Sequence, residues 1–450
     1  MLRPGQMVMV CAIALLTIGV VMVSSAKMGV QPLEPGADPV AASQASGVTP
    51  KSIILSRSTA YMCVAVLAMF GASWMPVRRL AGRASASMAD PKRRTIALLA
   101  GTAALVVVLS SVYWPVIGRE VNGSARWVNL RMPGLESFQP SELAKWGLIP
   151  LVAWYAGVCA LDADNRLRKF FFGLVPALVA IGAVAGFVVL EDLGTGFLMG
   201  VVACLVLLAA GARLWHFLMF VPVAGAGLVF AIIESPYRLR RITSFLDPFA
   251  DPQGDGYHMI QSMTTVSGAG PFGRGLGHGL QKFGYLPEDT TDFLFAIICE
   301  ELGLAGATLV IMLYAVLLWT MIGIVRRTES PVLKLVALGV TATVGLQACI
   351  NLVVVTGLGP TKGIALPMIS SGGTGWILTA MMLGVVVAID RPAAHAEEHA
   401  DDADATKADD LDDPDLADGE IGETYEPAEI VVPRRVKPRV RITPIPAAYE

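Results

Sequence analysis

Long apolar stretches recur along the first 390 residues and alternate with short polar connections. A helix needs about 20 apolar residues to cross the hydrocarbon core of a bilayer, since each residue adds about 1.5 Å to its length. The pattern therefore predicts an all-α polytopic membrane protein with about ten transmembrane helices. The predicted spans are residues 7–24, 54–75, 95–116, 143–160, 170–190, 193–211, 215–233, 293–325, 333–357 and 374–390.

Basic residues gather in three of the short connections. They are Arg78, Arg79, Arg83, Lys92, Arg93 and Arg94 after the second span, Arg166, Arg168 and Lys169 after the fourth, and Arg326, Arg327 and Lys334 after the eighth. Cytoplasmic loops carry an excess of lysine and arginine, so these connections are predicted to be cytoplasmic. Both termini are then cytoplasmic, and the connections 117–142, 234–292 and 358–373 are extracytoplasmic.

Composition supports a membrane protein, because 54% of the residues are hydrophobic and only 16% are charged. The net charge of −3 combines a mildly basic part, with 27 basic and 21 acidic residues up to 390, and an acidic remainder. We therefore predict a transmembrane catalytic body, 1–390, and a cytoplasmic tail, 391–450, that is acidic, then basic, and disordered. A solvated charge run is favoured over a partner-docking role for the basic end of the tail.

Several kinds of site are not expected. The six cysteines lie in apolar stretches at spacings that match no zinc motif, and the five histidines are scattered. The glycine-rich run GAGPFGRGLGHG follows no strand, and no Walker-type motif occurs, so nucleotide binding is not expected either.

Ionisable residues near the predicted span ends are candidate functional groups, because inserting a charge costs about 2.5–3.5 kcal/mol at the bilayer centre. Arg126 lies in the first extracytoplasmic connection, and Lys145 lies at the start of the fourth span. Lys145 has an alternative role as a structural partner of Glu142, one turn away. Asp192, between the fifth and sixth spans, is expected to cap the sixth helix.

Cations also occur in the other two extracytoplasmic connections. Arg238, Arg240 and Arg241 lie just outside the seventh span, on the side where positive charge is disfavoured. They either bind an anion such as a phosphate or extend to lipid phosphates, and the sequence favours neither explanation. The connection 358–373 adds Lys362.

The run YLPEDTTDFLFAIICEELG places five carboxylates at the start of the eighth span. Glu288, Asp289 and Asp292 belong to its outer rim, and Asp292 is a candidate reactive group and a candidate cap of the helix, two roles that can coexist. Glu300 and Glu301 lie about two turns deeper. Because neighbours on a helix point about 100° apart, we expect one of them to face a cavity and the other to find a structural partner.

Six segments between about residues 120 and 375 occur in a fixed order: VNGSARW, FQPSELAK, EDLGTG, LDPFADPQGDGYHMIQS, GLGHGLQKFGYLPEDTTDFLFAIICEELGL and GPTKGIALPMISSGG. Together they resemble the signature segments of the SEDS family, named after shape, elongation, division and sporulation. YLPE and PTKG resemble the division branch, FtsW, more than the elongation branch, RodA, whereas GYHMIQS is closer to RodA.

The resemblance implies a ten-span glycosyltransferase of the bacterial inner membrane. Such enzymes polymerise lipid II, an undecaprenyl-pyrophosphate-linked disaccharide-pentapeptide, into peptidoglycan glycan strands. The implied partners are lipid II, a class B penicillin-binding protein as transpeptidase and other membrane proteins of division or elongation complexes. No nucleic acid is implied.

The family motif PExHTDF marks Asp292 as the catalytic residue. This chain departs from the family pattern at Thr290, where histidine is common, at Glu191, where proline is common, and at Ser371, where tyrosine is common.

The implied reaction needs a base for the acceptor hydroxyl and positive charge for the leaving pyrophosphate. Asp292 is the predicted base, a role that contributes a factor of about 10²–10⁴. The predicted substrate-binding residues are Arg126, Lys145, Arg241, Glu288, Lys362 and Asp192. A divalent cation, Mg²⁺ or Mn²⁺, is the alternative partner of the pyrophosphate, with its ligands unassigned. The rival functions are a flippase for lipid II and a non-catalytic scaffold of the division complex.

Overall fold

The computed structural model describes residues 3–27, 50–86, 90–115, 117–121, 124–132, 135–162, 164–281, 290–370 and 373–409. Its α-helices are α1 (Pro4–Lys27), α3 (Pro50–Ile54), α4 (Arg57–Ser73), α5 (Val77–Ala86), α6 (Pro91–Ser110), α7 (Pro140–Ala160), α8 (Val175–Glu191), α9 (Leu193–Ala209), α10 (Leu214–Ile233), α11 (Pro236–Leu246), α12 (Tyr257–Ser267), α13 (Leu294–Arg327), α14 (Pro331–Val355) and α15 (Thr374–Asp409).

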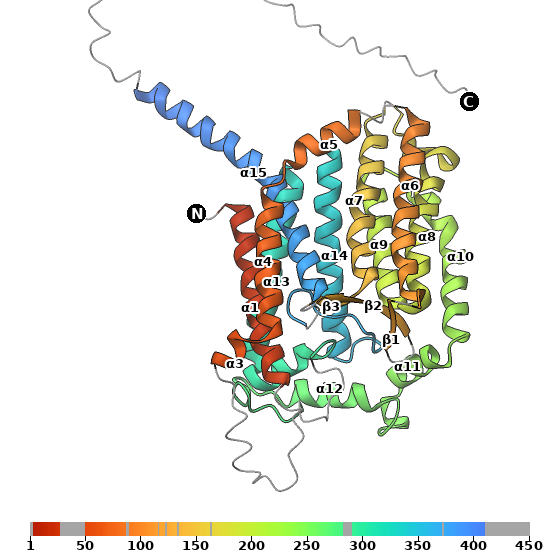
Figure 1. Ribbon diagram of the computed structural model, residues 1–450, viewed down its shortest axis with the longest axis vertical. Coiled ribbons are helices and arrows are strands. Elements are labelled where there is room, and N and C mark those ends of the chain that lie inside the picture. The colour runs from red at the N-terminus through yellow and green to blue at the C-terminus, as the bar shows by residue number, and fades with distance from the viewer. Residues whose placement is uncertain are drawn as a thin grey trace, which may run out of the picture. The chain divides into compact units, whose positions relative to one another are not determined.

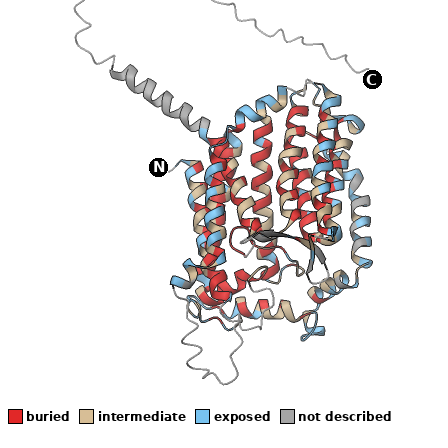
Figure 2. Ribbon diagram, viewed as in Figure 1, coloured by how far each residue is buried: buried red, intermediate tan, exposed pale blue. Residues whose placement is uncertain are grey.

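The long helices form one bundle. In its middle α7 packs against both α14 and α9, and α13 joins this group through α14 (Figure 1). On one side α6 and α8 cover α7, and on the other α1 packs against α13 and α4. Buried residues concentrate on the inward faces of these helices, whereas exposed residues lie on the outward faces (Figure 2).

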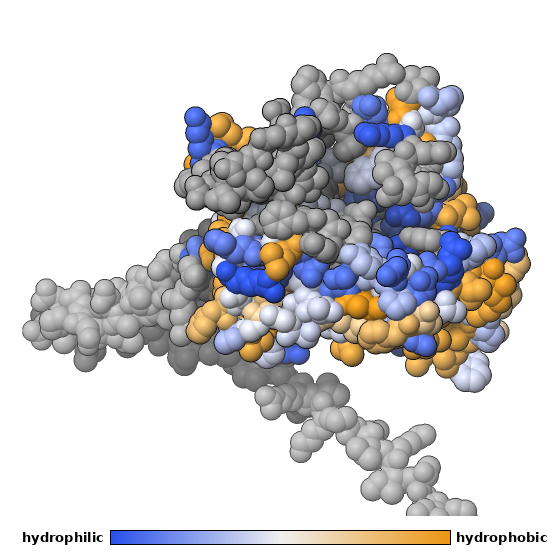
Figure 3. All heavy atoms as spheres, turned by 90° about the horizontal axis from the view of Figure 1, so that it is seen from below, coloured by the Kyte–Doolittle hydropathy of each residue, from blue (hydrophilic) through white to orange (hydrophobic). Residues whose placement is uncertain are grey.

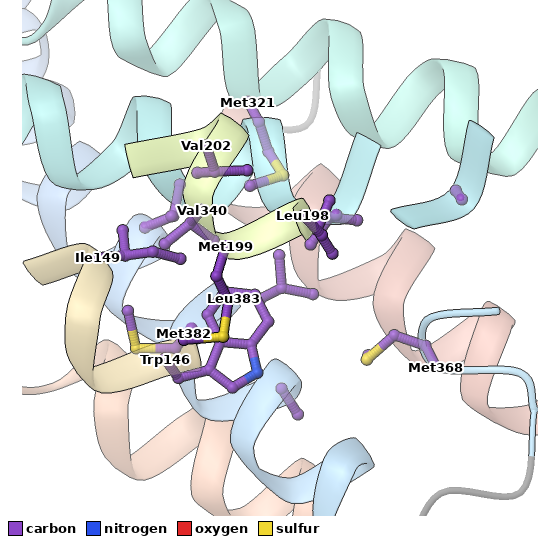
Figure 4. Close-up of a cluster of buried hydrophobic side chains, with 14 of the residues drawn as sticks. Trp146, Ile149, Leu198, Met199, Val202, Met321, Val340, Met368, Met382 and Leu383 are labelled. Atoms are coloured by element: carbon purple, nitrogen blue, oxygen red, sulfur yellow. The ribbon is translucent and has the colours of Figure 1, made fainter. Parts of the chain in front are cut away.

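Most side chains in the core of the bundle are apolar. Figure 4 shows Trp146 and Ile149 of α7, Met199 and Val202 of α9, and Val340 of α14 in one buried cluster. Met321 of α13 and Met382 of α15 belong to the same core. Flexible methionines fill the irregular gaps between helices, so the cluster joins helices from all parts of the chain.

Each of the ten predicted spans coincides with a helix of the structure. Seven described helices are long and apolar enough to cross a membrane, and an eighth candidate is the pair α4 and α5, bent by 59°. The chain is therefore a multi-pass helical membrane protein. The two other predicted spans correspond to α9, which has 17 residues, and to α10, so the number ten stays a prediction.

The three connections predicted to be extracytoplasmic lie at one end of the bundle, opposite α5 with its arginines (Figure 1). The connection 117–142 is not a plain loop. It holds a three-stranded antiparallel sheet of β1 (Gly118–Val121), β2 (Ser124–Met132) and β3 (Leu135–Phe138). The expectation of a purely α-helical chain missed this sheet, because its strands are short and carry no long apolar run.

The connection 234–292 also differs from the long loop that the sequence predicts. It contains α11, α12 and the short 3-10 helix η5 (Pro248–Ala250). Hydrophilic residues gather across the middle of this end of the molecule, with hydrophobic residues at the sides (Figure 3). Such a distribution suits an end that leaves the membrane.

The two ends of the membrane body lie side by side. The backbone N–H of Gly5, at the start of α1, donates to Oδ2 of Asp390 in α15 at 3.0 Å. This contact agrees with the prediction that both ends of the body lie on the same side of the membrane.

Helix α15 continues to Asp409, beyond the predicted start of the disordered tail at 391. Alanine is the best helix former, and it supplies seven of the 18 residues 392–409. Residues 1–397 and 398–450 form two separate units. The disorder predicted for the tail stays a prediction for 410–450, which lie outside the described residues.

Candidate active site

Several of the predicted site residues that the structure describes lie around residues 361–365, which we call the 361–365 segment, between α14 and α15. Arg241 of α11 donates from Nη1 to the carbonyl of Thr361 at 3.1 Å. Nζ of Lys362 lies 5.5 Å from the centre of the Phe197 ring in α9, a cation–π distance. The segment thus contacts α9 and α11, which belong to different parts of the chain.

Asp292 lies immediately before α13 and is partly exposed. The cap residue of α13 is Phe293, so the alternative explanation of Asp292 as the helix cap is wrong. A Cβ atom at Gly363 would lie 3.1 Å from Oδ2 of Asp292, so glycine leaves room for this carboxylate. Nδ2 of Asn351 donates to the carbonyls of Asp292 and Ile364, both at 2.8 Å, and so ties Asp292 to the 361–365 segment.

Asp192 caps α9, as the sequence predicts. Its carboxylate accepts hydrogen bonds from the backbone N and the Oγ1 of Thr195, at 3.1 and 2.9 Å. The same carboxylate lies 4.0 Å from Nη1 of Arg126, which extends from β2. Nε and Nη2 of Arg126 both donate to the carbonyl of Glu191 at the end of α8, at 3.1 and 2.6 Å. Two donors therefore fix the guanidinium beside Asp192.

Lys362 lies within the electrostatic reach of Asp192. Burial lowers the pKa of the Lys362 ammonium below its usual value of 10.5, and the negative charge of Asp192 partly offsets this effect. The lysine therefore gives up its proton more readily than an exposed lysine. Arg126, Asp192 and Lys362 together form a charged group with two cations and one anion.

Lys145 is buried, and its ammonium is held by two neighbours. Nζ donates to Oε1 of Glu142 at 2.8 Å and to Oε1 of Gln347 at 3.1 Å. The structural pairing with Glu142 is thus confirmed. Nε2 of Gln347 in turn donates to the carbonyl of Ala365 at 2.9 Å, so Lys145 connects to the 361–365 segment through one residue.

Two of the three arginines beyond α10, Arg238 and Arg241, donate to backbone carbonyls, a role that neither of the two explanations from the sequence included. Nη2 of Arg238 donates to the carbonyls of Val189 and Leu190 at the end of α8, both at 3.0 Å. Arg240 forms an exposed ion pair with Asp255 at 3.4 Å. Arg238 and Arg241 therefore connect α11 to α8 and to the 361–365 segment.

Glu300 and Glu301 do not divide their roles as the sequence predicts. Both side chains are buried and both accept hydrogen bonds from backbone N–H groups of residues 277–281, at the end of the glycine-rich run and just after it. Neighbouring side chains on a helix point about 100° apart. Both carboxylates nevertheless bind residues 277–281, because these residues pass close to both side chains. Neither is directed to the 361–365 segment by these bonds.

A partly open pocket lies beside Arg126 and Asp192, with about 290 Å³ of empty space including its mouth. Apolar side chains of α6, η2 (Ser111–Tyr113) and α8 line it together with polar groups. The lining residues are Leu109, Val112, Arg126, Ser141, Phe187, Val188, Glu191 and Asp192.

Glu288 and Asp289, two of the predicted rim carboxylates, lie outside the described residues. Within the described part of the chain, no group of three or more His, Cys, Asp and Glu side chains is arranged to hold a metal ion. A divalent cation held by Glu288 therefore stays a prediction.

Gln347 and Asn351 were missed as site residues, although they connect Lys145 and Asp292 to the 361–365 segment. Their signal is present in the sequence, because two amides four residues apart share one face of an otherwise apolar span. Polar residues within membrane helices mark functional sites more often than those in soluble helices do.

The family model described as "Cell cycle protein", for FtsW, RodA and SpoVE, matches residues 5–395. Stage V sporulation protein E of Bacillus subtilis is 39% identical over 285 residues, 63% of this chain and 76% of the relative. A probable peptidoglycan glycosyltransferase FtsW of Thioalkalivibrio sulfidiphilus is 37% identical over 383 residues, 84% of this chain and 87% of the relative.

Solved structures share the fold. A chain from work on "structural coordination of polymerization and crosslinking by a peptidoglycan synthase complex" is 25% identical, with a TM-score of 0.61 over 86% of this chain and 97% of the other. The rod shape determining protein RodA of Thermus thermophilus is 24% identical, with a TM-score of 0.54 over 85% of this chain and 95% of the other. The chain belongs to the FtsW/RodA/SpoVE family, which is the SEDS family indicated by its motifs, and it is FtsW-like within it.

Proposed function

We propose that this protein is a peptidoglycan glycosyltransferase that polymerises lipid II into glycan strands. Its relatives carry the name of this activity, and the SEDS motifs imply it. The observation that supports it best is the convergence on the 361–365 segment. There, one partly exposed carboxylate, Asp292, lies against a glycine next to the cation Lys362.

Asp292 is the general base in this proposal. The acceptor sugar hydroxyl must lose its proton as it attacks the anomeric carbon, and a carboxylate within hydrogen-bond reach can take that proton. Asn351 fixes the backbone of Asp292, and the absence of a side chain at Gly363 lets the carboxylate pack closely there. Asp292 is partly exposed, so a substrate oxygen is able to approach it from the solvent.

The leaving pyrophosphate needs positive charge, which Arg126, Arg241 and Lys362 supply in this proposal. Arginine and lysine stabilise phosphate oxygens by charge-assisted hydrogen bonds, and a partly dehydrated site strengthens them. Lys145 is buried and bonded to Gln347, so we assign it to holding the 361–365 segment rather than to the substrate itself. Asp192 orders this group by its position between Arg126 and Lys362.

In this proposal the junction of the lipid chain and its diphosphate lies beside Arg126. The lining there combines apolar side chains of α6 and α8 with the Arg126 guanidinium. Lipid II would then enter from the bilayer with its pyrophosphate next to the cations. Glu288 remains the proposed substrate or Mg²⁺ neighbour.

The proposed setting is the bacterial inner membrane, with cytoplasmic termini and a class B penicillin-binding protein as partner. A related chain comes from a solved complex that couples polymerization and crosslinking. Division membrane proteins are further proposed partners.

A flippase that moves lipid II across the membrane is the alternative function, since polar side chains among many helices also suit a transport path. Purified protein mixed with lipid II distinguishes the two. The proposal predicts glycan strands in detergent, where no transport is possible. Movement of labelled lipid II across vesicles without any strands would contradict it.

A further inference from the structure

The helix α13 is broken at Gly303, and an extracytoplasmic segment fills the break. Gly303 has φ 68° and ψ −164°, a conformation that glycine adopts far more readily than other residues. In an intact helix the carbonyls of Glu300 and Glu301 would accept from the N–H groups four residues later. Residues 270–275 supply partners for all four groups instead. The bonds are Arg274 N to Glu300 O (2.9 Å), Gly275 N to Glu301 O (2.9 Å), Leu304 N to Gly270 O (3.0 Å) and Ala305 N to Pro271 O (3.1 Å).

The side chains of Glu300 and Glu301 hold the next part of the same segment. Their exposed fractions are 4% and 0%. Each of the four carboxylate oxygens accepts from one backbone N–H group. The bonds are Gly277 N to Oε2 of Glu301 (3.0 Å), Gly279 N to Oε1 of Glu301 (3.3 Å), Leu280 N to Oε1 of Glu300 (2.8 Å) and Gln281 N to Oε2 of Glu300 (3.3 Å).

We call this group the carboxylate clasp: Glu300 and Glu301 with the N–H groups of residues 277–281. Ser25 of α1 adds its hydroxyl to Glu301, at 2.7 and 2.9 Å from the two oxygens. Only a carboxylate accepts at both oxygens, because an amide of the same shape replaces one acceptor by an NH₂ donor. Burying two charges and breaking a helix both cost free energy of folding. We therefore expect them to serve a purpose, which is to hold the segment bound in the break.

The clasp is connected to Asp292 through the first turns of α13. Glu300 and Glu301 lie in this stretch, and Asn351 donates to the carbonyl of Asp292 before it. Residues 294–299 form the helical stretch between Asp292 and the two carboxylates of the clasp. A shift of the clasp would therefore move the carboxylate that the reaction needs.

We propose that Glu300 and Glu301 are positioning residues, which set the place of Asp292 by fixing the glycine-rich run in the break of α13. This inference rests on the proposed role of Asp292 in polymerisation. Displacing a catalytic group by about 1 Å lowers turnover by up to about 10²-fold, even when the substrate still binds. Changes in the clasp should therefore lower kcat and leave KM nearly unchanged.

The test uses the purified full chain with lipid II. Glu301→Gln keeps the size of the side chain but turns an NH₂ group towards a backbone donor. Gly279→Ala perturbs the clasp from the other side, since its Cβ would lie 2.9 Å from Oε2 of Glu300 and 3.0 Å from Oε1 of Glu301. We expect kcat to fall about tenfold or more in both variants, with KM within about twofold. Amide hydrogen exchange in residues 275–281 should become faster.

Gly268→Ala is the matched control, because its Cβ would contact only the Thr264 carbonyl, at 3.1 Å. Turnover within about twofold of the unchanged chain in both clasp variants would overturn the proposal. Failure of both variants to fold, with Gly268→Ala folded, would also overturn it, since the clasp would then serve folding alone. If the unchanged chain and Gly268→Ala made no polymer, the proposed function itself would fail.

Discussion

At the scale of single residues, one short segment explains why chemically different side chains from distant helices lie together. The 361–365 segment exposes its backbone carbonyls to Arg241, Gln347 and Asn351, and each of these comes from a helix that also supports the site. The segment is thus fixed at three points. Its own side chain Lys362 can then point in one defined direction.

Deprotonation of Lys362 should lower kcat/KM at alkaline pH. Its pKa lies below 10.5 because the side chain is buried, so the positive charge is lost at a lower pH than in an exposed lysine. If that charge holds pyrophosphate, kcat/KM falls as pH rises through this lowered pKa. Lys362→Arg keeps the charge to above about pH 12 and should move this fall to higher pH.

The pH profile of kcat/KM checks this expectation. Lys334→Arg, at the other end of the bundle, is the control and should leave the profile unchanged. A fall at the same pH in Lys362→Arg would show that another group sets it.

Asn351 should matter for turnover although it is buried and uncharged. Asn351→Leu keeps the branched shape of the side chain but removes the donor to the carbonyls of Asp292 and Ile364. We expect kcat to fall about tenfold with KM nearly unchanged, because substrate contacts remain while Asp292 loses its support. Thr320→Val removes a hydroxyl that bonds only within its own helix and serves as the control. Equal turnover of both variants would contradict the assignment.

At the scale of elements, apolar length predicted the helices well, because a membrane span requires it. Every expected span coincides with a helix. The sheet β1–β3 escaped prediction, since short strands in a polar connection leave little periodic signal. The break in α13 was not predicted either, because the apolar pattern continues through Gly303. It is visible only in the structure, where residues 270–275 replace hydrogen bonds of the helix.

The site residues that could be predicted are those with a signal in the local sequence. Asp292, Lys362, Arg126 and Asp192 stand out as charges in an apolar chain. Asn351 is a neutral amide among aliphatic neighbours and gains its role only through contacts distant in sequence.

The break in α13 should not tolerate a side chain. A Cβ atom at Gly303 would lie 2.3 Å from the backbone N of Gly273, and the positive φ adds strain of about 1–3 kcal/mol. Gly303→Ala should therefore lower the melting temperature of the purified protein clearly. Gly323→Ala, later in the same helix, meets nothing within 4 Å and should melt at or above the original temperature. Equal melting temperatures of Gly303→Ala and Gly323→Ala would contradict the prediction that the break excludes a side chain.

At the scale of the whole molecule, the bundle separates a basic end from an end with the candidate site. The arginine-rich α5 lies at one end, and the sheet, α11 and α12 lie at the other (Figure 1). Such a division suits an enzyme whose lipid-linked substrate is used outside the cytoplasm.

Sidedness can be measured directly with a membrane-impermeant thiol reagent. Asp255→Cys in the connection 234–292 should react in intact spheroplasts, and Arg83→Cys in α5 should react only after lysis. A background without the six native cysteines avoids other labelling. Reaction of Arg83→Cys in intact spheroplasts would show that the orientation is opposite to the predicted one.

The most direct measurement of the central claim is the turnover of purified lipid II by Asp292→Asn beside Asp255→Asn. Both variants remove one negative charge from the same end of the molecule, but Asp255 forms only an exposed pair with Arg240. The account predicts a loss of about 10²-fold or more for Asp292→Asn and turnover near the original value for Asp255→Asn. Glycan strands formed at the original rate by Asp292→Asn would contradict the account.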